Sequence, residues 1–152
     1  MSETITIQDR IVEEAYSWLG TPYHQGCCIK GINGGISCGD LPVDIFKVMG
    51  FIPKSFKLPY IYKDWHRGLK KNVPEDLFRN IILKFGYEIS FKERCRGDVI
   101  TFKYNNIESH IAIIVEDDCI IHAVSGKGVK KQRLRNYKNI CSVYRVKDVR
   151  SS

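Results

Sequence analysis

Residues 109–124 read Ser-His-Ile-Ala-Ile-Ile-Val-Glu-Asp-Asp-Cys-Ile-Ile-His-Ala-Val, and this stretch decides the fold prediction. Two runs rich in β-branched residues flank an acidic turn, a pattern that predicts two adjacent antiparallel strands. Further short apolar runs, separated by turn residues, occur on both sides of this stretch. The predicted strands are Val99–Lys103, His110–Glu116, Cys119–Val124, Val129–Leu134 and Cys141–Val146.

Three helices are predicted ahead of these strands, over 6–19, Cys38–Met49 and about 74–85. Thr6 is the expected N-cap of the first helix, and Pro74 suits the first turn of the third. Helices first and strands afterwards predict an α+β fold rather than alternating βαβ units. No internal repeat or linker divides the chain, so we expect one domain over residues 1–152.

The formal charge is +7 and the pI about 9.1, which favours polyanionic partners such as nucleic acid, anionic lipid or an anionic cell wall. No nucleic-acid recognition motif is present, so we expect no nucleic-acid partner. No apolar run is long enough for a membrane span, and the first ten residues lack an apolar signal region. We therefore expect synthesis in the cytoplasm. The densest basic stretch contains Lys127, Lys130, Lys131, Arg133, Arg135 and Lys138.

Six cysteines are distributed along the chain without Cys-x-x-Cys spacing. A structural zinc site is therefore not expected, and neither is any other metal or cofactor. Without a signal region, a disulfide framework is also disfavoured.

Cys38 stands at the predicted start of the second helix. A thiol at a helix N-terminus lies near the positive end of the helix dipole and near free backbone N–H groups. Both should lower its pKa and favour the nucleophilic thiolate. A buried structural cysteine that happens to begin a helix is the alternative interpretation.

His110 and His122 favour the catalytic interpretation. They lie on neighbouring predicted strands, and the hairpin between them should bring the two rings side by side. One imidazole can then act as general base to the thiol, and the second can orient the first. The residues thus suggest a Cys-His-His hydrolase.

The sequence resembles the NlpC-type cell-wall cysteine peptidases, and within them the phage-associated branch. The resemblance extends over nearly the whole chain, and the order of its segments is more specific than any one of them. The segments are Trp18-Leu19-Gly20-Thr21-Pro22-Tyr23-His24-Gln25, Lys30-Gly31, Tyr60–Trp65 (YIYKDW), Arg96-Gly97-Asp98-Val99, Ser109-His110 and Ile120–Val129.

The resemblance implies a papain-like α+β fold with the nucleophile on a helix packed against the sheet that carries the histidines. It implies hydrolysis of an amide in peptidoglycan stem peptides, usually between D-glutamate and the diamino acid. Cys38 matches the nucleophile, His110 the base and His122 the polar third member. Tyr23 matches a tyrosine whose hydroxyl lies near the oxyanion, where a donor suits developing negative charge. Peptidoglycan or muropeptides, and possible phage-tail proteins, are the implied partners.

The chain departs from the family pattern around the nucleophile. Ser37 replaces the acid that normally precedes the cysteine and helps to hold the free amine of the stem peptide. We therefore expect weak discrimination between free and blocked amines. Asp40, two residues after Cys38, competes with the thiolate for the helix-dipole field and offers an alternative carboxylate for the same subsite. Pro42 places the helix start near Cys38 or Gly39, because proline fits only the first turn.

Other functions remain open from the sequence. A non-catalytic wall-binding or tail-structural protein on the same fold could use the basic charge and the aromatic residues Tyr60, Tyr62 and Trp65. A deamidase or acyltransferase could use the same thiol. Cys27 or Cys28 as nucleophile ranks below Cys38, because no helix begins at either.

Overall fold

The computed structural model describes residues 5–58 and 76–147. Its elements in chain order are α1 (Ile7–Ser17), β1 (Cys28–Ile29), β2 (Gly35–Ile36), α2 (Asp40–Val48), α3 (Leu77–Phe85), β3 (Gly86–Ile89), β4 (Val99–Tyr104), β5 (Ile107–Glu116), β6 (Cys119–Val124), β7 (Gly128–Arg133) and β8 (Ile140–Val146), with short 3-10 turns at Phe91–Glu93 and Leu134–Asn136. None of the helices in these ranges is long and apolar enough to cross a bilayer.

Helix α1 begins as its sequence predicts. The Thr6 side chain accepts a hydrogen bond from the Asp9 backbone N–H, and the Asp9 carboxylate accepts one from the Thr6 N–H, each at 3.1 Å. This capping box satisfies two N–H groups that have no partner within the helix. Ile11, Ala15 and Trp18 recur at helical spacing and are buried, so the apolar face of α1 packs on the core.

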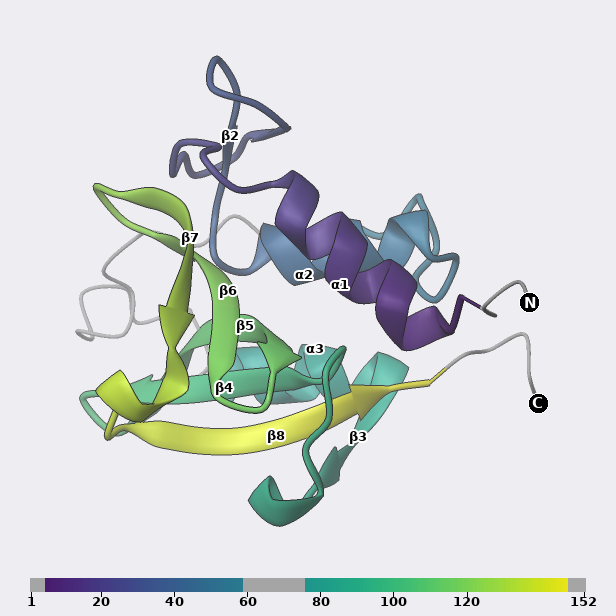
Figure 1. Cartoon of the computed structure of the whole chain (residues 1–152), viewed down its shortest axis with the longest axis vertical. Helices are drawn as coiled ribbons and strands as arrows, with labels where there is room; N and C mark the ends of the chain where they lie inside the picture. Colours follow the sequence, from purple (N-terminus) through teal and green to yellow (C-terminus); the bar gives the residue numbers. More distant parts are fainter. Residues whose placement is uncertain (1–4, 59–75, 148–152) are drawn as a thin grey trace.

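Strands β3 to β8 form one antiparallel sheet in the order β3-β8-β4-β5-β6-β7. All three helices contact β5, and Figure 1 shows α1 and α2 side by side over the sheet. The larger apolar cluster joins the helices to one sheet face, while a smaller cluster around Phe102, Ile114 and Ile120 lies on the other. This confirms the predicted α+β fold.

The structure adds strands that the sequence analysis missed. Strands β1 and β2 form a small hairpin at the end of the loop predicted over residues 20–35, and Cys28 pairs with Ile36 in it. Helix α3 is followed at once by β3, which pairs with β8. The hairpin is a separate two-stranded sheet and β3 is an edge strand of the main sheet; all three strands are short, and none has an alternating apolar pattern. Pro74 and the YIYKDW segment lie outside the described residues.

Candidate active site

The turn that presents Cys38 is built by its neighbours. The Ser37 carbonyl accepts a hydrogen bond from the Leu41 N–H at 3.1 Å, and the Ser37 hydroxyl oxygen accepts one from the Asp40 N–H at 3.2 Å. The same hydroxyl donates to the Asp40 carboxylate at 3.0 Å. Ser37 thus caps the helix start in the manner of an N-cap residue.

The regular helix begins at Asp40 rather than at the predicted Cys38. Pro42 has no N–H, so the Cys38 carbonyl cannot accept the hydrogen bond that would extend the regular pattern backwards. Cys38 therefore stands in a turn two residues ahead of α2. Pro42 lies in the first turn of α2 as expected, but the regular helix begins at Asp40, two residues after the predicted start.

The prediction of a lowered thiol pKa is wrong. Burial, together with the negative charge of Asp40, raises the pKa of Cys38 to about 11. Hydrogen bonding to Tyr23 and to the backbone N–H groups of Cys38 and Gly39 acts in the predicted direction but is outweighed. The free-energy cost of moving the thiolate charge out of water is larger here than the stabilisation that the N–H groups at the helix start provide. The Cys38 side chain is therefore a neutral thiol at neutral pH.

Tyr23 lies beside Cys38, as the sequence analysis expected. The backbone at Tyr23 forms a parallel bridge to Ile36, two residues before the cysteine. Burial, followed by the neighbouring Cys38, raises the Tyr23 pKa above its ordinary value. The phenol therefore keeps its proton and remains a hydrogen-bond donor next to the thiol.

The two histidines meet across β5 and β6. Ile113 pairs with Ile121 in this ladder, so His110 and His122 approach each other diagonally. His110 Nε2 lies 2.7 Å from His122 Nδ1, and the ring planes are inclined by 68°. The hairpin argument from the sequence thus predicted a contact that the structure contains.

Both rings are held in the neutral form by burial. Desolvation, with a smaller contribution from His122, lowers the pKa of His110 to about 3. Desolvation also lowers the pKa of His122, although its contact with Gln132 opposes this shift. A neutral imidazole can accept a proton from a thiol, whereas an imidazolium cannot.

Two further polar residues extend this pair, and the sequence analysis did not identify them. Gln132 Oε1 lies 2.6 Å from His122 Nε2, and the Tyr137 hydroxyl donates to the same Oε1. Tyr137 also lies 3.4 Å from His122 Nε2. The pairing of β6 with β7 could have predicted that Gln132 lies near His122, since Ile120 pairs with Gln132 and His122 with Lys130.

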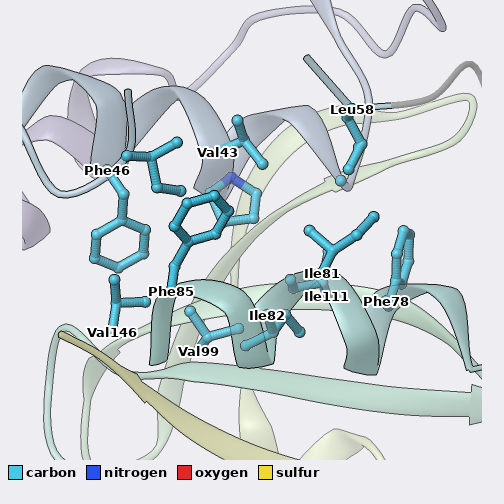
Figure 2. Close-up of a pocket in the computed structure, with 13 residues that line it drawn as sticks. Val43, Phe46, Leu58, Phe78, Ile81, Ile82, Phe85, Val99, Ile111 and Val146 are labelled. Carbon is cyan, nitrogen blue, oxygen red and sulfur yellow. The ribbon is translucent and has the colours of Figure 1, made fainter. Parts of the chain in front are cut away.

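Within the described residues, no hydrogen bond joins Cys38 to either histidine. Their chain neighbours Gly39 and Ile111 nevertheless line one apolar cavity of about 40 Å³ between α2, α3 and the sheet. In Figure 2, Phe46 and Val43 from α2 face Phe85 and Ile82 from α3 across this space. The cavity wall thus includes the residue that follows each of Cys38 and His110 in the chain, but neither Cys38 nor His110 itself.

Gly39 permits this close packing. A Cβ at Gly39 would lie 2.6 Å from Leu58 Cδ2 and 3.4 Å from Phe78 Cε1. Leu58 and Phe78 also line the cavity. A larger residue after the nucleophile would displace the wall of this cavity.

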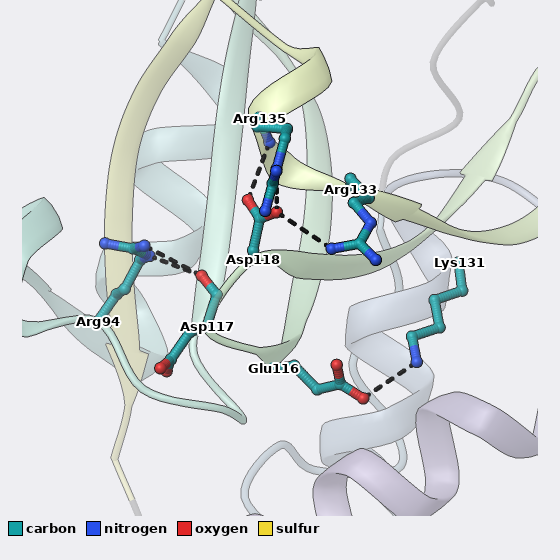
Figure 3. Close-up of polar contacts among 7 residues, drawn as sticks. All are labelled: Arg94, Glu116, Asp117, Asp118, Lys131, Arg133 and Arg135. Carbon is teal, nitrogen blue, oxygen red and sulfur yellow. Dashed lines mark hydrogen bonds and ion pairs between the residues drawn. The ribbon is translucent and has the colours of Figure 1, made fainter.

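The acidic turn between β5 and β6 neutralises part of the basic stretch. Lys131 Nζ lies 3.0 Å from Glu116, while Arg135 and Arg133 lie 2.6 Å and 3.7 Å from Asp118 (Figure 3). These contacts are largely exposed, and each contributes little stability. They reduce the free positive charge that this strand offers to a polyanion.

The described residues contain no group of three or more His, Cys, Asp or Glu side chains arranged to hold a metal ion. All six cysteines have free thiols.

Solved structures share this arrangement of helices and sheet. The NlpC/p60 domain of the peptidoglycan hydrolase SagA is 21% identical with a TM-score of 0.61, over 93% of this chain and 100% of that domain. NlpC1 from Trichomonas vaginalis is 17% identical with a TM-score of 0.65, over 94% of this chain and 45% of that one. The chain thus spans about half the length of NlpC1.

A third structure, RipD from Mycobacterium tuberculosis, is described as a non-catalytic NlpC/p60 domain protein adapted to peptidoglycan binding. It is 16% identical with a TM-score of 0.57, over 96% of this chain and 98% of that one. At these identities the likeness establishes the fold alone. A comparison with curated protein sequences found no match. The sequence model of the NlpC/P60 family matches residues 15–146, nearly the whole chain, and the protein therefore belongs to the NlpC/P60 family.

Proposed function

We propose that this protein is a cysteine peptidase that hydrolyses an amide bond in peptidoglycan stem peptides. The observation that carries the proposal is the 2.7 Å contact between His110 Nε2 and His122 Nδ1, in a chain whose Cys38 stands in the turn that leads into α2. This contact occupies one nitrogen of His110 and leaves Nδ1 as the only ring nitrogen available to a thiol. Family membership and the SagA likeness support the cell wall as the target.

In the proposed mechanism, Cys38 Sγ attacks the carbonyl carbon while its proton passes to His110 Nδ1. The thiol and imidazole are both neutral at rest, so the proton moves during the attack rather than before it. Tyr23 donates a hydrogen bond toward the developing oxyanion. His110 then protonates the leaving amine, and water releases the acyl group by the reverse sequence. Binding of substrate is expected to shorten the distance between thiol and base.

Asp40 is proposed to affect substrate choice. Its carboxylate accepts a hydrogen bond from the Ser37 hydroxyl, so a negative charge lies beside the position where the family pattern has an acid. This favours Asp40 as the partner of a free stem-peptide amine over the weak discrimination expected from Ser37 alone. A charge-assisted hydrogen bond contributes about 1.5–3 kcal/mol. Free and N-acetylated peptides should therefore differ about tenfold or more, and Asp40→Asn should remove most of that difference.

Digestion of purified peptidoglycan, followed by mass analysis of the fragments, tests the proposal directly. The parent protein should release fragments cut between D-glutamate and the diamino acid, and Cys38→Ala should release none. Cys95→Ala is the matched control, because Cys95 is an exposed thiol away from the histidines. Equal cleavage by the parent and Cys38→Ala would contradict the proposal, and so would intact peptidoglycan after digestion with the parent.

A non-catalytic wall-binding role is the second candidate. The raised pKa of Cys38 and the serine that replaces the family's acid both favour it, and RipD offers a precedent on this fold. Sedimentation with intact peptidoglycan, without fragment release, would support this role. A deamidase or acyltransferase would instead release ammonia or an exchanged acyl product without shortening the peptide.

We further propose that the protein reaches the wall by phage-type delivery or another non-classical route, with phage-tail proteins as partners. The resemblance of the sequence to the phage-associated branch motivates this proposal. Co-purification with tail particles is the measurement that tests it.

A further inference from the structure

The sheet face that carries the histidines continues beyond them as a polar chain. Gln132 comes from β7 and Tyr137 from the segment after the Leu134–Asn136 turn. Gln132 Oε1 receives both the His122 Nε2 contact at 2.6 Å and the Tyr137 hydroxyl. The Tyr137 ring packs edge-on to His122 and also contacts Phe102. The glutamine amide is thus held from two sides.

The chemistry of an amide oxygen fixes the direction of these hydrogen bonds. The oxygen has lone pairs and no hydrogen, so it can only accept. His122 Nε2 must therefore carry a proton and donate it. A neutral imidazole carries one proton, so His122 Nδ1 has a lone pair and must accept from His110 Nε2–H. By the same rule His110 Nδ1 carries the second lone pair.

We propose that Gln132, with its amide oriented by Tyr137, is a positioning residue that fixes the ring tautomers of His122 and His110. The inference rests on the proposed function in one respect, because the lone pair on His110 Nδ1 matters for catalysis only if His110 is the base. If the Gln132 amide were reversed, its NH₂ would donate to His122 Nε2. His110 Nδ1 would then carry a proton and could not accept one from Cys38.

A neutral hydrogen-bond partner for His122, such as Gln132, is also compatible with the positive charge that develops on His110 during the reaction. When His110 Nδ1 takes the thiol proton, the ring becomes an imidazolium with a hydrogen on each nitrogen. Its Nε2–H still donates to His122 Nδ1, and no other proton has to move. A carboxylate at position 132 would instead favour a protonated His122, whose Nδ1–H could not accept from His110. Among the described residues, the titratable groups near this pair include the Tyr137 hydroxyl, Tyr104, whose ring contacts His110, and the exposed Lys130, the register partner of His122.

Nitrogen-15 NMR of the histidine rings in the parent protein at pH 7.5 tests the first step without any activity assay. We expect both His110 and His122 to be neutral, with the proton on Nε2 and none on Nδ1. A proton on Nδ1 of either ring would overturn the assignment. This measurement needs no variant, so it does not depend on whether a substituted protein folds.

Substitutions test the second step. Gln132→Leu removes the acceptor at similar size, and we expect mixed His122 tautomers and a fall of about 10- to 100-fold in kcat with little change in KM. This is less than the roughly 10²–10⁴-fold that a general base itself contributes, because the base is still present in one of the tautomers. Gln132→Glu should lower kcat and raise the apparent pKa of His122. Tyr137→Phe should give a smaller loss in the same direction. Gln8→Leu, at an exposed glutamine on α1, is the matched control and should change nothing.

Two outcomes separate this proposal from the proposed function. If Gln132→Leu keeps the parent tautomers and the parent kcat, the positioning role is wrong even though hydrolysis stands. If the parent shows the expected tautomers but cleaves no peptidoglycan, the proposed function fails and the assignment of Gln132 stands.

Discussion

The Cys38 thiol is expected to react with iodoacetamide more slowly than an exposed cysteine at neutral pH. Alkylation requires the thiolate, and the pKa of Cys38 is raised from 9.0 to about 11. Two pKa units reduce the thiolate fraction roughly 100-fold below pH 9. A more basic thiolate is intrinsically about tenfold more nucleophilic, so the net rate should be about tenfold lower.

The assay is alkylation between pH 6.5 and 9.5, followed by digestion and mass quantification of the Cys38 and Cys95 peptides. Cys95 is exposed and serves as an internal reference in the same sample. The Cys38 rate should still rise about tenfold per pH unit at the upper limit. Asp40→Asn should increase the rate, because the Asp40 charge raises the thiol pKa, whereas Tyr23→Phe should decrease it.

A rate for Cys38 that levels off below pH 8.5, or that exceeds the Cys95 rate at neutral pH, would refute this reasoning. It would mean that the N–H groups at the helix start stabilise the thiolate more than burial destabilises it. The original expectation from the sequence would then be correct.

Three further predictions concern stability, each measured by urea denaturation. The folded state lowers the pKa of His110 to about 3 and also lowers that of His122, while the unfolded chain protonates near pH 6.5. The free energy of unfolding should therefore fall as the pH drops below 6.5, by about 1.4 kcal/mol per pH unit for His110, and a double His→Gln variant should lose this slope. Gly128→Ala should cost more than Gly126→Ala: both have positive φ, +86° and +80°, worth about 1–2 kcal/mol, but only at Gly128 would a Cβ meet a backbone oxygen at 2.6 Å. Ser37→Ala should cost about 1 kcal/mol through loss of the cap, and no change would show that the cap is dispensable.

Much of the fold could be predicted because its signals are local. Thr6 and Asp9 define the start of α1 by themselves, since the capping box uses only neighbouring groups. The strands from Val99 onward follow from β-branched runs and the turns between them. The β3 strand was missed because its pairing with β8 depends on a partner that lies far along the chain.

The candidate site also has some features that the local sequence predicts and others that depend on distant segments. The sequence by itself predicted that His110 and His122 would lie close together, because they stand on the two strands of one hairpin, and in the structure they meet diagonally. Only the tertiary structure decided the ionisation of Cys38, because burial by distant segments sets the cost of a charge there. It also decided the partner of His122, since Gln132 reaches that ring only when β7 pairs with β6. Hydrogen bonds between neighbours can be read along the chain, whereas desolvation depends on everything that packs around a group.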